Sequence, residues 1–157
     1  MKCFSNVRIL IATVVILVGA LTAAAVERPF AAHGSGLAVF ITDGAGHVIG
    51  ANLTESGTGT HLGMWTAVGT LQFAPDPNDP TKILGSGAAT LTASDGDKLQ
   101  AVASGTVDAA TGVAQGVLRF VGGTGRFAAA SGSANFVVTQ NFATGAFEAT
   151  YVGTIDF

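Results

Sequence analysis

The glycine-rich stretch FVGGTGRFAAASG, residues 120–132, is the part of the sequence that most resembles a site of chemistry. Its spacing Gly123-x-Gly125-x-x-Ala128 fits a dinucleotide-binding fingerprint, and the run VLRFV that overlaps its start is typical of a strand. Such a loop binds phosphate because a helix N-terminus follows it. Here Gly132 ends any helix that begins after the loop, and an alternating strand pattern follows. The stretch therefore does not predict a nucleotide site.

The same stretch favours a turn between two strands. Gly122, Gly123 and Gly125 can all take a positive φ without steric cost. We expect this turn to lead into a short 3₁₀ or helical turn, with Phe127 packed inward and Arg126 either bonded to loop carbonyls or in solvent.

The three histidines, His33, His47 and His61, are fourteen residues apart, a spacing that suggests a metal site. A tight turn at residues 44 and 45 would place His33 opposite Ser56, about 30 Å from His47 along the hairpin. His33 and His61 could share one rim, but two ligands are too few for a specific site. We therefore expect no metal and no cofactor.

Residues for acid–base or nucleophilic catalysis are sparse. The sequence contains no G-x-S-x-G nucleophile elbow, and most of its aspartates lie in turn motifs, where they bond the backbone. Glu55 and Glu148 are the carboxylates available for proton transfer, and alternation places Glu148 on the wet face of its strand. No catalytic residue is predicted.

Large aromatic residues are the best candidates for a binding site. Those expected to point inward are Trp65, Phe40, Phe73, Phe120, Phe136 and Tyr151. Trp65 and Tyr151 come first because each adds a hydrogen-bond donor to an apolar ring. Arg119 lies mid-strand and either reaches solvent or anchors an anionic group of a ligand. The predicted ligand-binding residues are Trp65, Arg119, Phe120, Phe136 and Tyr151.

The N-terminus has the pattern of a secretory signal peptide. Lys2 and Arg8 precede the uncharged run 9–26, and Ala23 and Ala25 fit an A-x-A cleavage site. We predict a signal peptide over 1–25 with cleavage after Ala25, and a secreted or periplasmic protein. The alternative is a retained membrane anchor; after cleavage we expect no stable membrane association.

The composition limits the partners of the remaining chain. Its length of 157 residues corresponds to about one domain. Removal of 1–25 also removes the single cysteine and leaves five basic against ten acidic residues, a net charge of −5. We therefore expect no disulfides and no binding to nucleic acid.

Turn signals divide the chain after residue 33 into strands. The motifs DGAG, PDPNDP, SDGD, DAATG and NFATG each separate runs rich in Val, Ile, Thr, Phe and Ala. The strands predicted between them cover 35–42, 47–55, 60–74, 82–93, 97–107, 113–121, 133–140 and 146–157. Eight strands joined mostly by hairpins predict an antiparallel up-and-down β-barrel over 34–157, preceded by a short N-terminal segment, 26–33.

The glycine turn and the closing segment FEATYVGTIDF resemble the allene oxide cyclase and dirigent barrel superfamily, in particular its small secreted bacterial members. The segment TGTHLGMWTAVGTL, 58–71, is similar to an early strand of those proteins. The resemblance implies a calycin-like eight-stranded barrel with an apolar cavity, and a trimer as the form of assembly. The segment that matches the family residue by residue is the turn Gly122–Phe127. This match supports the fold, and it contains no catalytic motif.

Three functions are compatible with this sequence. The leading hypothesis is a secreted, non-catalytic barrel that binds a small apolar molecule or serves as a structural module. The second is an isomerase or cyclase, or a dirigent-like barrel that guides a reactive lipid or phenolic intermediate. The third is a module that assembles into homo-oligomers. A buried acid, Asn or Arg facing a cavity of roughly a few hundred Å³ would favour the enzyme, whereas an interior filled by Phe, Leu and Val without such a group would exclude it.

Overall fold

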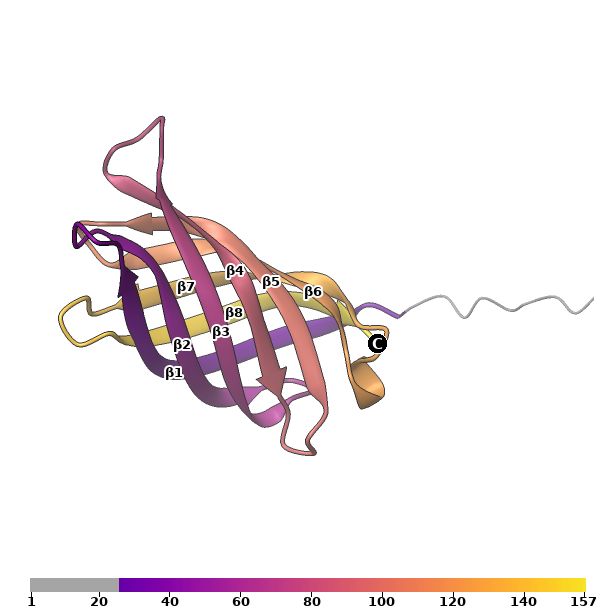
Figure 1. Ribbon diagram of the computed structural model, residues 1–157. Coiled ribbons are helices and arrows are strands. Elements are labelled where there is room, and N and C mark those ends of the chain that lie inside the picture. The colour runs from indigo at the N-terminus through magenta and orange to yellow at the C-terminus, as the bar shows by residue number, and fades with distance from the viewer. Residues whose placement is uncertain (1–25) are drawn as a thin grey trace, which may run out of the picture.

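The computed structural model describes residues 26–157, which form eight antiparallel strands closed into an up-and-down barrel (Figure 1). Each strand pairs with its neighbours in the sequence, and the last strand pairs with the first to close the barrel. The strands are β1 (Arg28–Thr42), β2 (Val48–Gly59), β3 (Gly63–Pro75), β4 (Lys82–Thr92), β5 (Lys98–Asp108), β6 (Val113–Gly123), β7 (Ser131–Gln140) and β8 (Ala146–Asp156). The predicted fold class is confirmed. The predicted signal peptide lies outside the described residues.

The alternation of side chains determines which face of each strand is buried. In β8, Phe147, Ala149 and Ile155 are buried, whereas Glu148 and Thr150 between them are exposed. Because successive side chains of a strand point to opposite faces, this pattern fills the barrel with apolar groups and leaves polar ones on its outer surface. The prediction that alternation places Glu148 on the wet face of its strand is confirmed.

The first strand begins earlier than the sequence pattern predicted. β1 starts at Arg28 instead of residue 35, so most of the predicted N-terminal segment 26–33 belongs to the barrel. Residues 28–37 pair with β8, and Phe30 is 1% exposed against Phe120. Proline and glycine obscured this strand in the sequence, but pairing with β8, which closes the barrel, extends β1 back to Arg28.

The first hairpin also differs in register. His33 pairs with Thr58 instead of Ser56, because the turn extends over residues 43–47 and a bulge lies between Ile41 and Thr42. An unpaired residue in one strand shifts the register of every later pair. The length of the turn alone does not predict such a bulge.

The glycine turn after β6 has the predicted geometry. Gly122 and Gly125 take positive φ values of 98° and 55°. The 3₁₀ helix η1 (Gly125–Phe127) follows directly, and Phe127 has no exposed surface. Both the short 3₁₀ turn and the inward Phe127 are confirmed.

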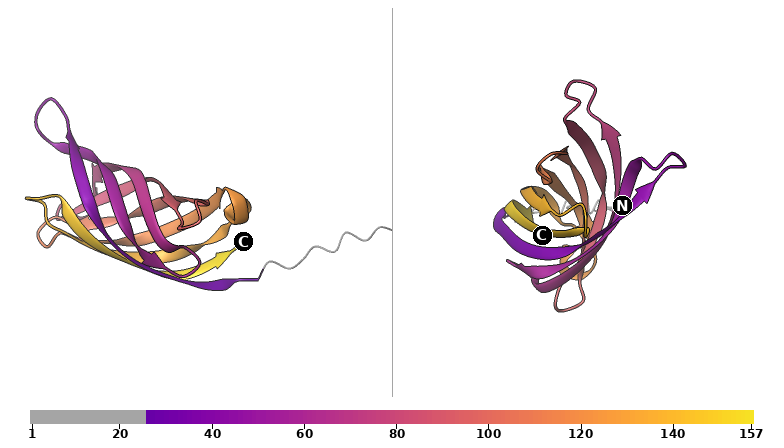
Figure 2. Two further views of the ribbon diagram at one scale, coloured as in Figure 1. Left: turned by 90° about the horizontal axis from the view of Figure 1, so that it is seen from below. Right: turned by 90° about the vertical axis from the view of Figure 1, so that its left-hand side faces the viewer.

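This turn closes one end of the barrel. The ring of Phe127 lies 5.1 Å from that of Phe157, and the fully buried Leu62, Leu99 and Ile155 belong to the same core cluster. The C-terminus and η1 lie together at this end in Figure 1, and the loops that join β1 to β2 and β7 to β8 lie at the other. The left view of Figure 2, seen from below, shows the same two ends of the barrel apart from each other.

Arg126 holds the turn in place. Its guanidinium donates to the Asp95 carboxylate and to the backbone carbonyl of His61, and its backbone N–H donates to Asp97 over 3.0 Å. Of the two sequence-based alternatives for Arg126, the one in which it bonds loop carbonyls is therefore observed. These bonds tie η1 to the β2–β3 and β4–β5 loops.

Within residues 26–157, no helix is both long and apolar enough to span a membrane.

Candidate functional site

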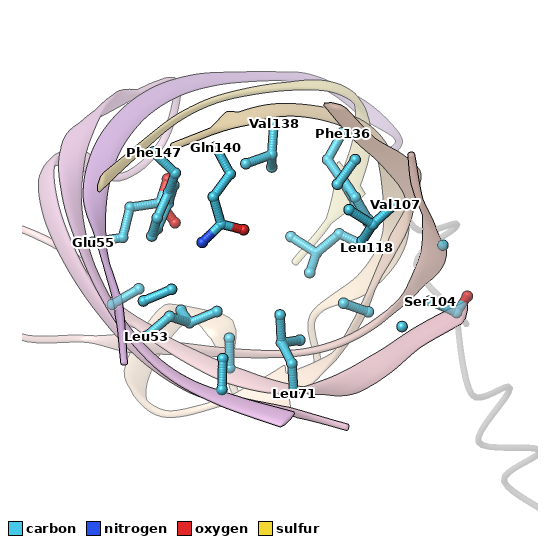
Figure 3. A pocket seen from close by; sticks show the side chains of 18 of the residues that line it. Leu53, Glu55, Leu71, Ser104, Val107, Leu118, Phe136, Val138, Gln140 and Phe147 are labelled. Atoms are coloured by element: carbon cyan, nitrogen blue, oxygen red, sulfur yellow. The ribbon is translucent and has the colours of Figure 1, made fainter. Parts of the chain in front are cut away.

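An apolar cavity of about 120 Å³ lies inside the barrel (Figure 3). Lining residues such as Ala38, Val107 and Gln140 lie near the strand ends away from η1, so the cavity occupies that half of the barrel. Its walls come from all eight strands, mostly through alanine, leucine, valine and phenylalanine side chains. The large apolar residues that line it are Leu53, Leu71, Phe73, Leu91, Val107, Leu118, Phe136, Val138 and Phe147. The packed core at the closed end forms its base, so the molecule is a barrel that is filled at one end and hollow toward the other.

Glu55 is the buried charged residue of this cavity. Only 7% of its surface is exposed, and its side chain reaches the cavity from β2. The hydroxyl of Tyr151, from β8, lies 2.9 Å from Glu55 Oε2 and 3.1 Å from Oε1, and donates to this carboxyl group. Trp65 packs edge-on against Tyr151, with ring centroids 6.3 Å apart. A hydrogen-bonded Glu–Tyr pair therefore lies inside a mostly apolar wall.

A glycine between the two strands makes this pair possible. β1 runs between β2 and β8, and Gly34 is one of its inward-facing residues. A Cβ at Gly34 would lie 2.4 Å from Glu55 Oε1 and 2.8 Å from the Trp65 ring. Because Gly34 has no side chain, Glu55 and Tyr151 meet across β1.

Burial changes the acidity of both members of the pair. Desolvation raises the pKa of Glu55 from 4.5 to about 7, and this outweighs the bond from Tyr151 and the charge of His33, which lower it. The pKa of Tyr151 is raised as well, first by burial and then by the neighbouring Glu55. The tyrosine therefore stays a donor, while the carboxyl group can change its protonation state near neutral pH.

The structure brings together two of the five predicted ligand-binding residues on the cavity wall. Tyr151 and Phe136 line the cavity. Trp65 is 2% exposed and lies beside Tyr151, in the packed core. Phe120 is also part of that core, against Phe30.

Arg119 does not belong to the site. It is exposed on the outer face of β6, between the buried Leu118 and Phe120. Strand alternation forces this orientation, so Arg119 points away from the cavity and cannot anchor a ligand inside the barrel. The alternative, in which it reaches solvent, is the one observed.

Sequence reasoning missed Gln140 and left the role of Glu55 open. A signal for both was present. Glu55 follows Ala51 and Leu53 at a spacing of two, and Gln140 follows Phe136 and Val138 in the same way. Because a strand repeats every two residues, each polar group shares the apolar face of its strand and points inward.

Among residues 26–157, no group of three or more His, Cys, Asp or Glu side chains could hold a metal ion. His47 bonds Asp43 within its own turn, at 3.0 Å, and the Nε2 of His61 contacts the carbonyl of Pro29.

No protein-family model matches this chain, and no curated protein matches it either.

Proposed function

We propose that this protein binds one small apolar molecule inside the barrel, with the Glu55–Tyr151 pair as the polar end of the site. The observation that carries the proposal is the half-hollow barrel, in which an apolar cavity meets a single buried carboxyl group. Cavities of roughly 150 Å³ lined by apolar residues are known to take up a benzene-sized molecule. The cavity of about 120 Å³ has a similar size.

The shape of the wall favours a flat ligand. The ring of Phe147 covers Gly36, where a Cβ would lie 2.6 Å from its Cζ, and the ring of Phe136 covers the paired Gly105 and Gly116 in the same way. Both rings border the cavity. Aromatic rings bind other flat apolar groups by stacking or edge contacts, which adds to the gain from burial.

Blocking the cavity is expected to abolish binding. Gly85 faces the cavity, and a Cβ there would meet only the edge of Phe73, at 3.4 Å, so a larger residue can be accommodated. Gly85→Leu fills the space a ligand would occupy, and we expect it to weaken binding of α-methylstyrene about tenfold or more. The fluorescence of Trp65, the single tryptophan, reports the titration because its ring packs against Tyr151.

Ser86→Leu is the matched control. Ser86 is the next residue of β4 and lies on the outer face, so the same side chain is added outside the cavity. Binding that is equal in the two variants would contradict the proposal, as would a wild-type protein that gives no response.

Acid–base catalysis is a second candidate function, favoured by one observation. Glu55 faces the cavity and its pKa is raised to about 7, which suits a general base at neutral pH. In this second proposal the barrel is an isomerase or cyclase that moves a proton on an apolar substrate.

A Kemp elimination tests this second candidate with a flat apolar probe. The carboxylate of Glu55 takes the C3 proton of 5-nitrobenzisoxazole, the N–O bond breaks, and a cyanophenolate forms. Glu55→Gln is expected to lower the rate about 100-fold, and the wild-type rate is expected to rise with pH around 7. Equal rates in the two proteins would exclude Glu55 as a base.

Three sequence-based predictions accompany these proposals and stay predictions. They are secretion after cleavage behind Ala25, membership of the allene oxide cyclase and dirigent superfamily, and assembly into homo-oligomers.

A further inference from the structure

Gln140 is a second polar group at the cavity, and its amide is incompletely bonded. It is the last residue of β7 and is partly buried. Within residues 26–157, its Nε2 is buried and has no hydrogen-bond partner. Figure 3 shows the amide extending from the wall into the cavity.

An unpaired buried N–H donor is unfavourable, since folding has removed it from water without giving it an acceptor. A ligand that places an oxygen acceptor beside Nε2 removes this penalty. Within residues 26–157, the other buried side-chain donor without a partner is the indole Nε1 of Trp65, which lies in the packed core. Gln140 is therefore the one of these two unpaired donors whose side chain lines the cavity.

Gln140 and Glu55 lie in one row of paired residues. Gln140 pairs with Phe147, Phe147 with Gly36, and Gly36 with Glu55. Three strand spacings separate the two polar residues, on the order of 14 Å along the curved wall. The ring of Phe147 lies between them, over Gly36. The row thus presents an amide donor, a flat apolar surface and a carboxyl group in succession.

We propose that Gln140 determines the specificity of this cavity by donating from Nε2 to a carbonyl-type oxygen of a small aromatic or other flat ligand packed on Phe147. This inference rests on the proposed binding function and defines its ligand class: an apolar molecule that carries an oxygen acceptor at one edge.

Two isosteric probes test the proposal. Acetophenone and α-methylstyrene have the same shape and differ in a C=O against a C=CH₂ group, so only acetophenone can accept a hydrogen bond. Both are titrated against wild type and Gln140→Leu, with Trp65 fluorescence as the readout. Within one protein, the ratio of the two dissociation constants cancels most of the effect that the substitution has on both probes alike. Comparing this ratio between proteins then cancels the difference in hydration between the two probes.

In Gln140→Leu we expect acetophenone to lose about fivefold in affinity relative to α-methylstyrene. This factor corresponds to the free energy of one ordinary hydrogen bond. Gln115→Leu, which changes an exposed glutamine on β6, is the control and is expected to leave the ratio unchanged. Gln140→Met repeats the test with an unbranched side chain in case leucine prevents folding.

The outcomes separate the two proposals. If both probes bind wild type, are excluded by Gly85→Leu, and keep the same ratio in Gln140→Leu and Gln140→Met, the role of Gln140 is overturned and the binding function stands. If neither probe binds wild type, the binding function fails and this inference fails with it.

Discussion

The free energy of unfolding is expected to fall by about 3 kcal/mol as the pH rises from 4.5 to above 7, because of Glu55 alone. Burial raises the pKa of this carboxyl group to about 7 in the folded protein, whereas the unfolded chain has the ordinary value of 4.5. Between these values the folded state holds a proton that the unfolded state has lost. The stabilisation is therefore complete below pH 4.5 and is lost as the pH rises through 7.

Glu55→Gln supplies the comparison, because an amide does not titrate in this range. Urea unfolding of both proteins at several pH values gives the difference between their free energies of unfolding. Asp43, Asp79 and Asp108 have lowered pKa values, so their contributions change at lower pH and cancel in that difference. A difference that is constant from pH 4.5 to 8 would show that Glu55 is not buried as described.

Phe127→Ala is expected to destabilise the barrel by about 3–5 kcal/mol. The side chain has no exposed surface, packs edge-on against Phe157 and lies under the guanidinium of Arg126. Its removal opens a cavity at the closed end, and the η1 turn cannot collapse to fill it because Arg126 is bonded to two neighbouring loops. Urea unfolding at a single pH measures the loss.

Phe142→Ala is the control for this second prediction. Phe142 is 43% exposed in the β7–β8 loop, and its ring is 6.1 Å from that of Phe40. We expect its removal to cost no more than about 1 kcal/mol, since a large part of its surface stays in water and the loop around it can relax. If the two variants lost stability equally, the closed end would not be the main core of the molecule.

The architecture was predictable because its signals are local. Turn motifs such as DGAG and NFATG mark hairpins, and the two-residue period of β8 fixes which side of the strand is buried. Gly122 and Gly125 identified a turn because they lack the steric restriction that other residues meet at positive φ. Each of these inferences depends on neighbouring residues alone.

The site was predictable only in part because it depends on pairing between distant strands. The same period that placed Tyr151 inward also places Glu55 inward, but their contact requires β2 and β8 to lie on either side of β1 with Gly34 between them. The sequence carries no direct record of that register. Arg119 shows the opposite case: its orientation was left open, although alternation with Leu118 and Phe120 would have been enough to place it outside.

The position of a bound probe tests the central claim most directly. Nuclear Overhauser effects between α-methylstyrene and labelled methyl groups distinguish the inside of the barrel from its outer wall. We predict contacts to Leu53, Leu71 and Val138, which line the cavity. Contacts confined to the exposed Val39 and Val152 of the outer wall, or no contacts at all, would contradict the account of this protein as a barrel with an internal binding site.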